Sequence, residues 1–471
     1  MTETALSSDE IMRRAANRGG EALDALLPAL ADGRVEPAEL VHRPRLLADL
    51  DIRSRRAYGH SPVLVPESFF LDRPSPLTAA LATMSRDGRV RERAVVALAR
   101  PGAAAVFLSF IVLRCGDWVS QVREPARVAV AELLASDLAR HLPLALPMAA
   151  YTAARHRGGW VMTRLRQALA ERFDELGRVL VRSRDQRERR LAFEVGADLG
   201  RWTHDELVHF AVHAKDPLIR LRGVDAVSAT ADVAALRLLV RSRYSGVRLS
   251  ALVGLARLSL DDEVAALVDD PAPLVRAYAR SRATDPVAHY RAAVAAGPTP
   301  ATVAGLGEVG HYADEARLTP LLSHHDPRIR AAAVRALAAV DSLPVPAVTA
   351  LLRDLSPTVV REAANALRGR HLSGDLWLLL AEPRVEVRRG AYRVLTGGDL
   401  RTRLRAALLL AADADPGLAR RGHADAGRLV RHGLAGLGHY QHDLSAGDRA
   451  ELAGLAARLS PYLADGVRAL R

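Results

Sequence analysis

The stretch that decides the fold is residues 324–340, His-His-Asp-Pro-Arg-Ile-Arg-Ala-Ala-Ala-Val-Arg-Ala-Leu-Ala-Ala-Val. Asp326 is a good N-cap, because its carboxylate can accept hydrogen bonds from the free amides of a first helical turn. Pro327 then takes the first helical position, where a missing N–H costs nothing. The apolar residues that follow at helical spacing form one stripe: Ile329, Ala333, Leu337 and Val340. The stretch therefore predicts a turn followed at once by an amphipathic helix.

The same pattern recurs along the chain. An apolar residue precedes an arginine, a small residue follows three positions later, and an apolar residue usually follows after seven. The arginines of the clear copies are Arg91, Arg123, Arg220, Arg248, Arg276, Arg330 and Arg388. Degraded copies contain Arg189 and Val360. Two intervals are about twice the usual spacing of about 28–32 residues, so each predicts a diverged unit, near residues 150–165 and 300–310.

A second apolar segment lies between successive motif helices, so each repeat is predicted to be a pair of antiparallel helices. One such pair cannot bury its apolar stripe alone, whereas stacked pairs bury a continuous core. Aromatic residues make up only 4% of the chain, which favours closely packed helices over sheets. We therefore expect an all-α fold, a right-handed α-solenoid (superhelix) of stacked antiparallel helix pairs.

The pattern Asp-Pro-x-Ile-Arg-x-x-Ala-x-x-x-Leu resembles the HEAT-repeat family, in the short form shared with phycobilin-lyase-like repeat proteins. The resemblance implies that the aspartates lie in the turn between the two helices of a repeat: Asp216, Asp270 and Asp326. It also implies that the motif arginines form a column along the helices that line the concave face. Ser245-Gly246 and Glu382-Pro383 depart from the pattern, because they replace the Asp-Pro pair.

The extent of the repeat pattern divides the chain into three predicted parts. Residues 1–76 are expected to form an N-terminal helical cap with a proline-rich insertion. Residues 77–400 form the HEAT-like array, and residues 401–471 form a C-terminal helical cap, since solenoids need atypical terminal units.

The arginine column has two interpretations, which do not exclude each other. In the first, each arginine pairs with a turn aspartate of its own or the neighbouring repeat and forms a structural ladder. In the second, some of these arginines also face a ligand.

The densest basic region is residues 155–190, which contain eleven arginines against five carboxylates. A basic patch that includes an aromatic side chain is typical of phosphate-backbone binding. The alternative is a solvated helix face with intrahelical ion pairs. The candidate anion- or partner-binding residues are Arg155, Arg157, Trp160, Arg164, Arg166, Arg182, Arg184, Arg187, Arg189 and Arg190.

Motifs for catalysis and cofactors are weak. Gly305-Leu-Gly-Glu-Val-Gly310 matches the dinucleotide fingerprint by letter, but that site needs a preceding strand. Asp117-Trp118 and Trp202 supply the residue types that HEAT-like DNA glycosylases use, without a distinguishing spacing. Two groups contain metal-ligand residue types: His324, His325 and Asp326 in a turn, and His439, His442 and Asp443 at helical spacing. No histidine is followed by the glutamate of HEAT-repeat iron hydroxylases, and we expect no catalytic residue, cofactor or metal.

The net charge is +12, and Lys215 is the only lysine. This arginine bias reflects either genome composition or an anion-binding face. A single cysteine, Cys115, suits the cytoplasm. The N-terminus lacks the pattern of a signal peptide, and the apolar run 101–113 is too short to span a bilayer.

We therefore predict a non-catalytic cytoplasmic scaffold or adaptor that presents a concave surface to a protein partner with an acidic surface. The alternative is a nucleic-acid-binding protein that uses the patch at 155–190. An enzyme of glycosylase or lyase type is a third, more distant reading.

Overall fold

The computed structural model describes part of the chain, and only helices and turns occur within that part. The described residues are 8, 12, 26, 29, 30, 34–40, 43–56, 74–100, 105–370, 376–432 and 444–470. The apolar middle of the proline-rich insertion, 63–71, lies outside them, as do His439, His442 and Asp443. The prediction of an all-α fold of stacked helix pairs is confirmed.

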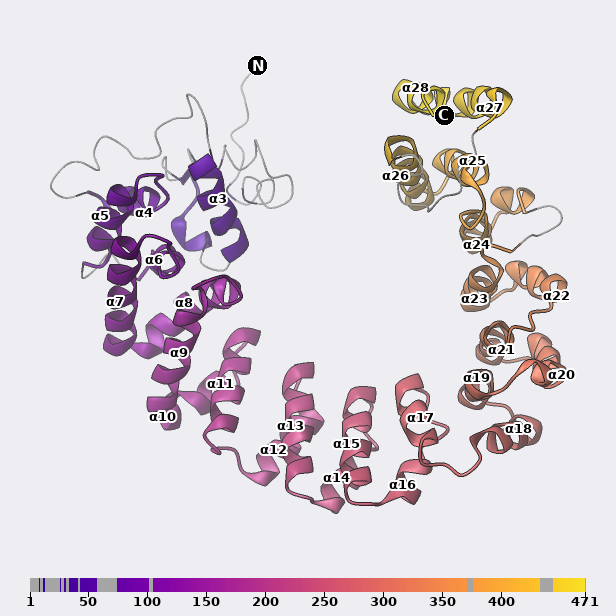
Figure 1. Cartoon of the computed structure of the whole chain (residues 1–471), viewed down its shortest axis with the longest axis horizontal. Coiled ribbons are helices and arrows are strands. Elements are labelled where there is room, and N and C mark those ends of the chain that lie inside the picture. The colour runs from indigo at the N-terminus through magenta and orange to yellow at the C-terminus, as the bar shows by residue number, and fades with distance from the viewer. Residues whose placement is uncertain are drawn as a thin grey trace. The chain divides into compact units, whose positions relative to one another are not determined.

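The chain forms two compact units, unit 1 (Met1–Val227) and unit 2 (Ser228–Arg471). Figure 1 shows the helices of each unit stacked in succession. Unit 1 has one apolar core that runs from Met12 to Ile219. Unit 2 has two apolar clusters, which run from Val268 to Val394 and from Tyr392 to Val467. The predicted division at 76/77 and 400/401 stays a prediction.

The helices of unit 1 follow one another through short turns. They are η1 (Pro37–Leu40), α3 (Pro44–Arg56), α4 (Pro76–Ala82), α5 (Gly88–Leu98), α6 (Leu108–Arg114), α7 (Ser120–Ser136), α8 (Leu138–Thr152), α9 (Gly159–Glu171), α10 (Phe173–Leu180), α11 (Gln186–Asp198), α12 (His204–His213) and α13 (Pro217–Ala229), in which the unit ends.

Unit 2 continues the alternation, with several first helices shortened or replaced by 3-10 turns. Its elements are α14 (Val233–Leu239), α15 (Ser245–Arg257), α16 (Asp261–Ala265), α17 (Pro273–Arg280), α18 (Pro286–Ala296), α19 (Pro300–Val309), η3 (Tyr312–Asp314), α20 (Glu315–Leu318), η4 (Thr319–Ser323), α21 (Pro327–Ala339), α22 (Val345–Ala350), η5 (Leu351–Arg353), α23 (Pro357–Leu367), η6 (Leu378–Ala381), α24 (Val385–Leu395), α25 (Leu400–Ala411), α26 (Pro416–His432), α27 (Ala446–Ala457) and α28 (Pro461–Arg468).

The second helices of successive repeats pack against one another. In unit 1 the row is α5, α7, α9 and α11, and in unit 2 it includes α19, α21, α23 and α24. The predicted diverged units are present in both long intervals, because α8 and α9 fill the first and α18 and α19 fill the second. The stretch 324–340 folds as predicted: Asp326 caps α21 by accepting from the N–H of Arg328 at 2.8 Å.

The motif arginine links two consecutive turns. Arg248 on α15 donates from Nε and Nη2 to the two carboxylate oxygens of Asp270, at 2.7 Å each. Its Nη1 donates to the carbonyl of Ser242 at 2.7 Å in the turn before its own helix. The same bidentate contact joins Arg91 to Asp117, Arg330 to Asp354 and Arg388 to Asp413. At these four junctions, one guanidinium therefore ties a turn to the next.

The accepting aspartate occupies a fixed place, two residues before the N-cap of the next second helix. From there its carboxylate also accepts a backbone N–H two residues on, as Asp270 does from Ala272 at 2.8 Å. Such a local bond holds the turn in shape. The acceptor therefore organises its own turn as well as the junction between repeats.

Two of the aspartates assigned to the ladder lie elsewhere. Asp326 binds the side chain of Arg328 at 2.9 Å, and Arg330 pairs with Asp354 instead. Asp216 accepts from Arg190 rather than from a motif arginine, at 2.8 and 3.1 Å. Asp216 and Asp326 both occupy the N-cap place, four residues before the motif arginine, rather than the acceptor place.

Where the next turn has no carboxylate at the acceptor place, the motif arginine finds another partner. Gly297 occupies that place after α17 and α18, and Arg276 binds Glu308 of α19. Arg123 binds Glu124 of its own helix at 2.9 Å. His324 occupies the acceptor place before α21, and the preceding repeat has Val303 where the arginine would be. That junction therefore has neither the arginine donor nor the carboxylate acceptor.

The glycine-rich sequence 305–310 lies on α19 and its C-cap, so it has no dinucleotide-binding context. A Cβ on Gly305 would overlap the ring of Tyr290, and a Cβ on Gly307 would lie 2.5 Å from the Cα of Ala336. The glycines therefore allow α18 and α21 to approach α19 closely.

We expect Asp413→Ala to destabilise the chain by about 3 kcal/mol, because it leaves the half-buried Arg388 without its carboxylate. Burial alone would raise the pKa of Asp413, but hydrogen bonds from Arg388 and from the backbone N–H of Asp415 lower it. Its contribution is therefore present above the unfolded-state pKa of about 3.9 and is lost as the pH falls through the lower folded-state pKa.

Urea titrations from pH 7 to pH 3, followed by circular dichroism, measure both effects. The variant should lose less stability than the parent on acidification. The control is Asp225→Ala, an exposed position on α13, which should change stability by no more than about 0.5 kcal/mol. Equal midpoints for Asp413→Ala and the parent at pH 7 would contradict the structural role of the ladder.

We expect Gly307→Ala to destabilise the chain by about 1–3 kcal/mol, because the added methyl group overlaps α21. The matched control is Gly454→Ala on α27, where a Cβ would meet nothing within 4 Å. This control should stabilise the chain by about 0.5–1 kcal/mol through helix propensity alone. Opposite shifts of the urea midpoint are the expected result, and shifts of the same sign would refute the close helix contact.

Candidate partner-binding site

The predicted basic patch is spread over three segments of unit 1. Arg155 and Arg157 lie in the turn between α8 and α9. Trp160, Arg164 and Arg166 lie on α9, and the remaining arginines lie in the turn before α11 or on its first two turns: Arg182, Arg184, Arg187, Arg189 and Arg190.

Several of these arginines are committed to internal contacts. Arg166 binds Glu194 at 2.5 Å and Asp198 at 2.8 Å on α11. Arg189 donates to the carbonyls of Ser183 and Arg184 at 2.8 Å each, which is the contact that motif arginines make with their own turn. Arg190 binds Asp216. The patch is therefore partly a repeat-to-repeat contact, as the structural interpretation expected.

Trp160 and Arg155 make local cation–π contacts. The guanidinium of Arg127 lies 5.2 Å from the Trp160 ring centre, and that of Arg155 lies 4.8 Å from the Tyr151 ring centre. Each of these two rings is therefore already in contact with an arginine of this chain.

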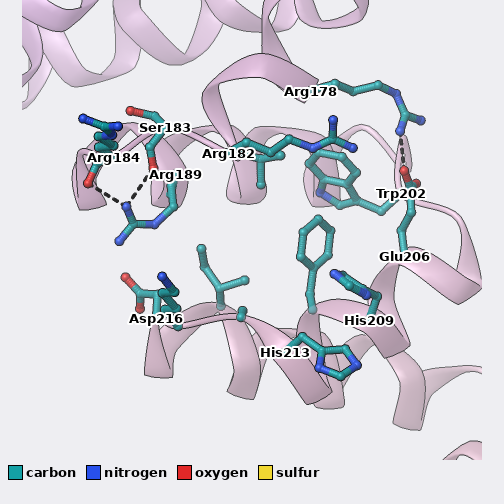
Figure 2. A pocket seen from close by; sticks show the side chains of 15 residues that line it. Arg178, Arg182, Ser183, Arg184, Arg189, Trp202, Glu206, His209, His213 and Asp216 are labelled. Atoms are coloured by element: carbon teal, nitrogen blue, oxygen red, sulfur yellow. Dashed lines mark hydrogen bonds and ion pairs between the residues drawn. The ribbon is translucent and has the colours of Figure 1, made fainter.

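A cavity of about 680 Å³ opens in unit 1 between the α10–α11 pair and the α12–α13 pair. Figure 2 shows Arg182, Arg184 and Arg189 on one edge and His209, His213 and Asp216 on the other. The lining residues are Arg178, Val181, Arg182, Ser183, Arg184, Arg189, Trp202, Glu206, His209, Phe210, His213, Ala214, Lys215, Asp216 and Ile219.

The cavity lies at a gap in the ladder. Ala214 occupies the acceptor place in the turn before α13, so Arg189 has no carboxylate there to receive its Nε and Nη2. The bridge is shifted by one residue at the donor and by two at the acceptor, and it runs from Arg190 on α11 to Asp216 at the N-cap place. Burial would raise the pKa of Asp216, but the hydrogen bonds from Arg190 and Gln186 lower it, so the carboxylate stays charged.

One wall of the cavity is aromatic. The ring centres of Trp202 and Phe210 lie 5.1 Å apart, and those of Trp202 and Phe173 lie 5.4 Å apart, both edge to face. Phe193 stacks on Trp202 at 6.3 Å and also accepts the indole N–H at its carbonyl, at 2.9 Å. Because that N–H is satisfied internally, the part of Trp202 that faces the cavity is apolar.

The rim of the cavity carries positive charge without internal compensation. Within the described part of the chain, the side chains of Arg182, Arg184 and Lys215 make no ion pair or hydrogen bond. Arg178, by contrast, binds Glu206. A hydrogen bond from the backbone of Thr203 and the contact with Arg178 lower the pKa of Glu206. The two rim carboxylates, Glu206 and Asp216, are therefore neutralised by arginines that do not belong to this group of three free cations.

The sequence identified Arg182, Arg184 and Arg189 but not the rest of this site. The basic patch was predicted from residues that are neighbours in the sequence. It therefore omitted the cavity residues that belong to the next repeat, which are His209, Phe210, His213 and Lys215. Ala214 stands where the bridged turns have an aspartate. A comparison of the turn sequences would therefore have distinguished this junction from the bridged ones.

A smaller cavity of about 200 Å³ surrounds Asp117 and Trp118. The carboxylate of Asp117 is 1% exposed and accepts from Arg91, Arg114 and Arg55, at 3.1, 3.2 and 3.5 Å. Next to it, burial raises the pKa of Asp51 in spite of a 2.6 Å contact with Arg114. Asp117 therefore serves the ladder and this buried ion network, which joins α3 to the array.

Within the described ranges, no cluster of three or more His, Cys, Asp or Glu side chains could hold a metal ion. No helix in these ranges has both the length and the apolar character to cross a membrane. Cys115 is buried, and burial raises the pKa of its thiol.

Three solved structures are similar to this chain at low identity. Importin beta is 14% identical over 98% of this chain and 65% of its own, with a TM-score of 0.27. A structure on tubulin recruitment by microtubule polymerases with tumour overexpressed gene domain arrays is 13% identical, over 95% and 99%, with a TM-score of 0.19. An engineered protein is 18% identical, over 68% and 94%, with a TM-score of 0.12. This chain thus spans about two thirds of importin beta.

No curated protein matches the chain. A family model described as HEAT repeats matches residues 301–368, which include the stretch 324–340. The resemblance inferred from the Asp-Pro-x-Ile-Arg pattern is confirmed there. Residues 301–368 are therefore HEAT repeats.

Proposed function

We propose that this chain is a non-catalytic cytoplasmic scaffold that binds an acidic protein partner through the cavity rim in unit 1. The observation that supports the proposal is the group of three free cations, Arg182, Arg184 and Lys215, around one opening. Most motif arginines are instead paired with carboxylates or carbonyls inside the fold.

Free cations at a rim suit recognition of an acidic surface. They stay hydrated until the partner arrives, and their field then steers the encounter and favours partners of opposite charge. The ladder keeps the turns that carry them in fixed positions, so little ordering is required on binding.

Nucleic acid is the alternative partner, since a basic patch with aromatic side chains also suits phosphate backbones. The arrangement favours protein, because the free cations surround one cavity instead of following a stripe that could track a backbone. Arg155 and Arg157 would have to extend the contact, and they lie in a different turn.

The proposal predicts that Arg182→Glu/Arg184→Glu/Lys215→Glu weakens partner capture from the native host. The control is Arg222→Glu/Arg257→Glu/Arg458→Glu, which makes the same charge change at exposed positions whose side chains make no ion pair or hydrogen bond within the described residues. The parent and the control should capture the same acidic protein after nuclease treatment. The rim variant should bind it at least about tenfold more weakly, because charge reversal replaces attraction by repulsion.

Other outcomes are equally informative. Capture that disappears after nuclease treatment would favour the nucleic-acid alternative. Equal binding by the rim variant would show that the partner uses another surface. Arg189 and Arg190 are left intact in this design, because their replacement would disturb the turn before α11 and the bridge to Asp216.

A further inference from the structure

We infer that the cavity between the α10–α11 and α12–α13 pairs is an anchor pocket for an aromatic side chain of the partner, flanked by acidic residues. The inference rests on the proposed function and specifies the chemistry of the partner segment that binds. An acidic surface alone would need only the rim, whereas the cavity offers an apolar interior that charge does not explain.

The size of the cavity suits a buried anchor. Its volume of about 680 Å³ lies within the range of about 300–1,000 Å³ that is typical of ligand pockets. Residues that anchor protein interfaces fill such pockets, and aromatic side chains are prominent among them. An electrostatic contact with the rim alone would not require a cavity of this volume.

The chemistry of the wall favours an aromatic guest over an aliphatic one. The motif helices elsewhere bury mainly Ala, Val, Leu and Ile against each other, for example along α21. Here Trp202 and Phe210 line the cavity, and the buried rings of Phe173 and Phe193 pack against them in edge-to-face and stacked contacts. A further ring can continue that packing, since aromatic pairs prefer these geometries.

Cations lie on more than one side of the aromatic wall. In Figure 2 Arg182 extends toward Trp202, whereas Arg184 lies toward the other end of the cavity. Lys215 belongs to the opposite edge, next to Asp216. A partner segment with acidic residues before and after its aromatic anchor would therefore meet a cation in either direction.

The gap in the ladder explains why space exists here. With Ala214 at the acceptor place, no carboxylate draws Arg189 across the junction, and the α12–α13 pair contacts its neighbour through the shifted Arg190–Asp216 bridge. Ala214 itself lines the cavity. A large side chain at this position would fill the pocket without removing a cation, and so would one at Val181 on the opposite edge.

The experiment selects peptides from a random phage-displayed library against the intact chain and measures the affinity of synthetic copies. The enriched peptides should share an aromatic residue flanked by acidic ones. Their affinity should fall at least about tenfold on Ala214→Trp, on Val181→Trp, and when the peptide aromatic is replaced by alanine. Arg182→Gln/Arg184→Gln should weaken binding, whereas Arg222→Gln/Arg257→Gln should not. Two cavity-filling variants, one on each edge, are used so that the result does not depend on a single variant. Circular dichroism identifies a variant that misfolds.

Two results would overturn the anchor. One is the absence of any enriched peptide, and the other is affinity that survives both filling variants. Acidic peptides that need the rim arginines but no aromatic residue would refute the anchor and leave the acidic-partner proposal standing. Enriched peptides that are indifferent to both the rim and the filling variants would refute the two proposals together.

Discussion

The arginine four residues after the N-cap stabilises two turns at once, because its guanidinium presents hydrogen-bond donors along two edges in one rigid plane. One edge holds the carbonyls of its own turn, and the other holds a carboxylate of the next turn, as Arg248 does with Ser242 and Asp270. Lysine could not make both contacts with one fixed geometry. At the junctions that have this bridge, the packing of one pair of helices on the next depends on it together with the apolar contacts beneath it.

The bridge also explains why the candidate site lies where it does. In unit 1 the regular bridge is absent at the junction between Arg189 and Ala214. The displaced bridge from Arg190 to Asp216 takes its place. The space that results is walled by aromatic rings and surrounded by cations without counter-charges. The proposed binding site thus lies at a departure from the repeat, whereas the clear copy at 324–340 serves stacking.

Much of the fold could be predicted from the sequence, because helical spacing and N-cap residues are local signals. The motif arginines and both diverged units were located this way. The ladder acceptors were partly misassigned, because Asp326 is the most visible aspartate of its turn, whereas the acceptor Asp354 belongs to the next repeat and has no proline beside it. The cavity could not be predicted, because it depends on an absent side chain at Ala214 and on Trp202 and Phe210 meeting across a turn.

The paired loss of donor and acceptor between α19 and α21 has a consequence for the order of the repeats. Val303 stands in place of the arginine on one side of that junction, and His324 stands in place of the carboxylate on the other. Removing both partners of a buried pair is tolerated, whereas removing one leaves an uncompensated charge. At the junctions that have a bidentate bridge, each repeat is therefore matched to the neighbour that follows it. Exchange of the repeat that contains Arg248 for one without the arginine, for example, would leave the buried carboxylate of Asp270 without its partner, so the units resemble one another without being interchangeable.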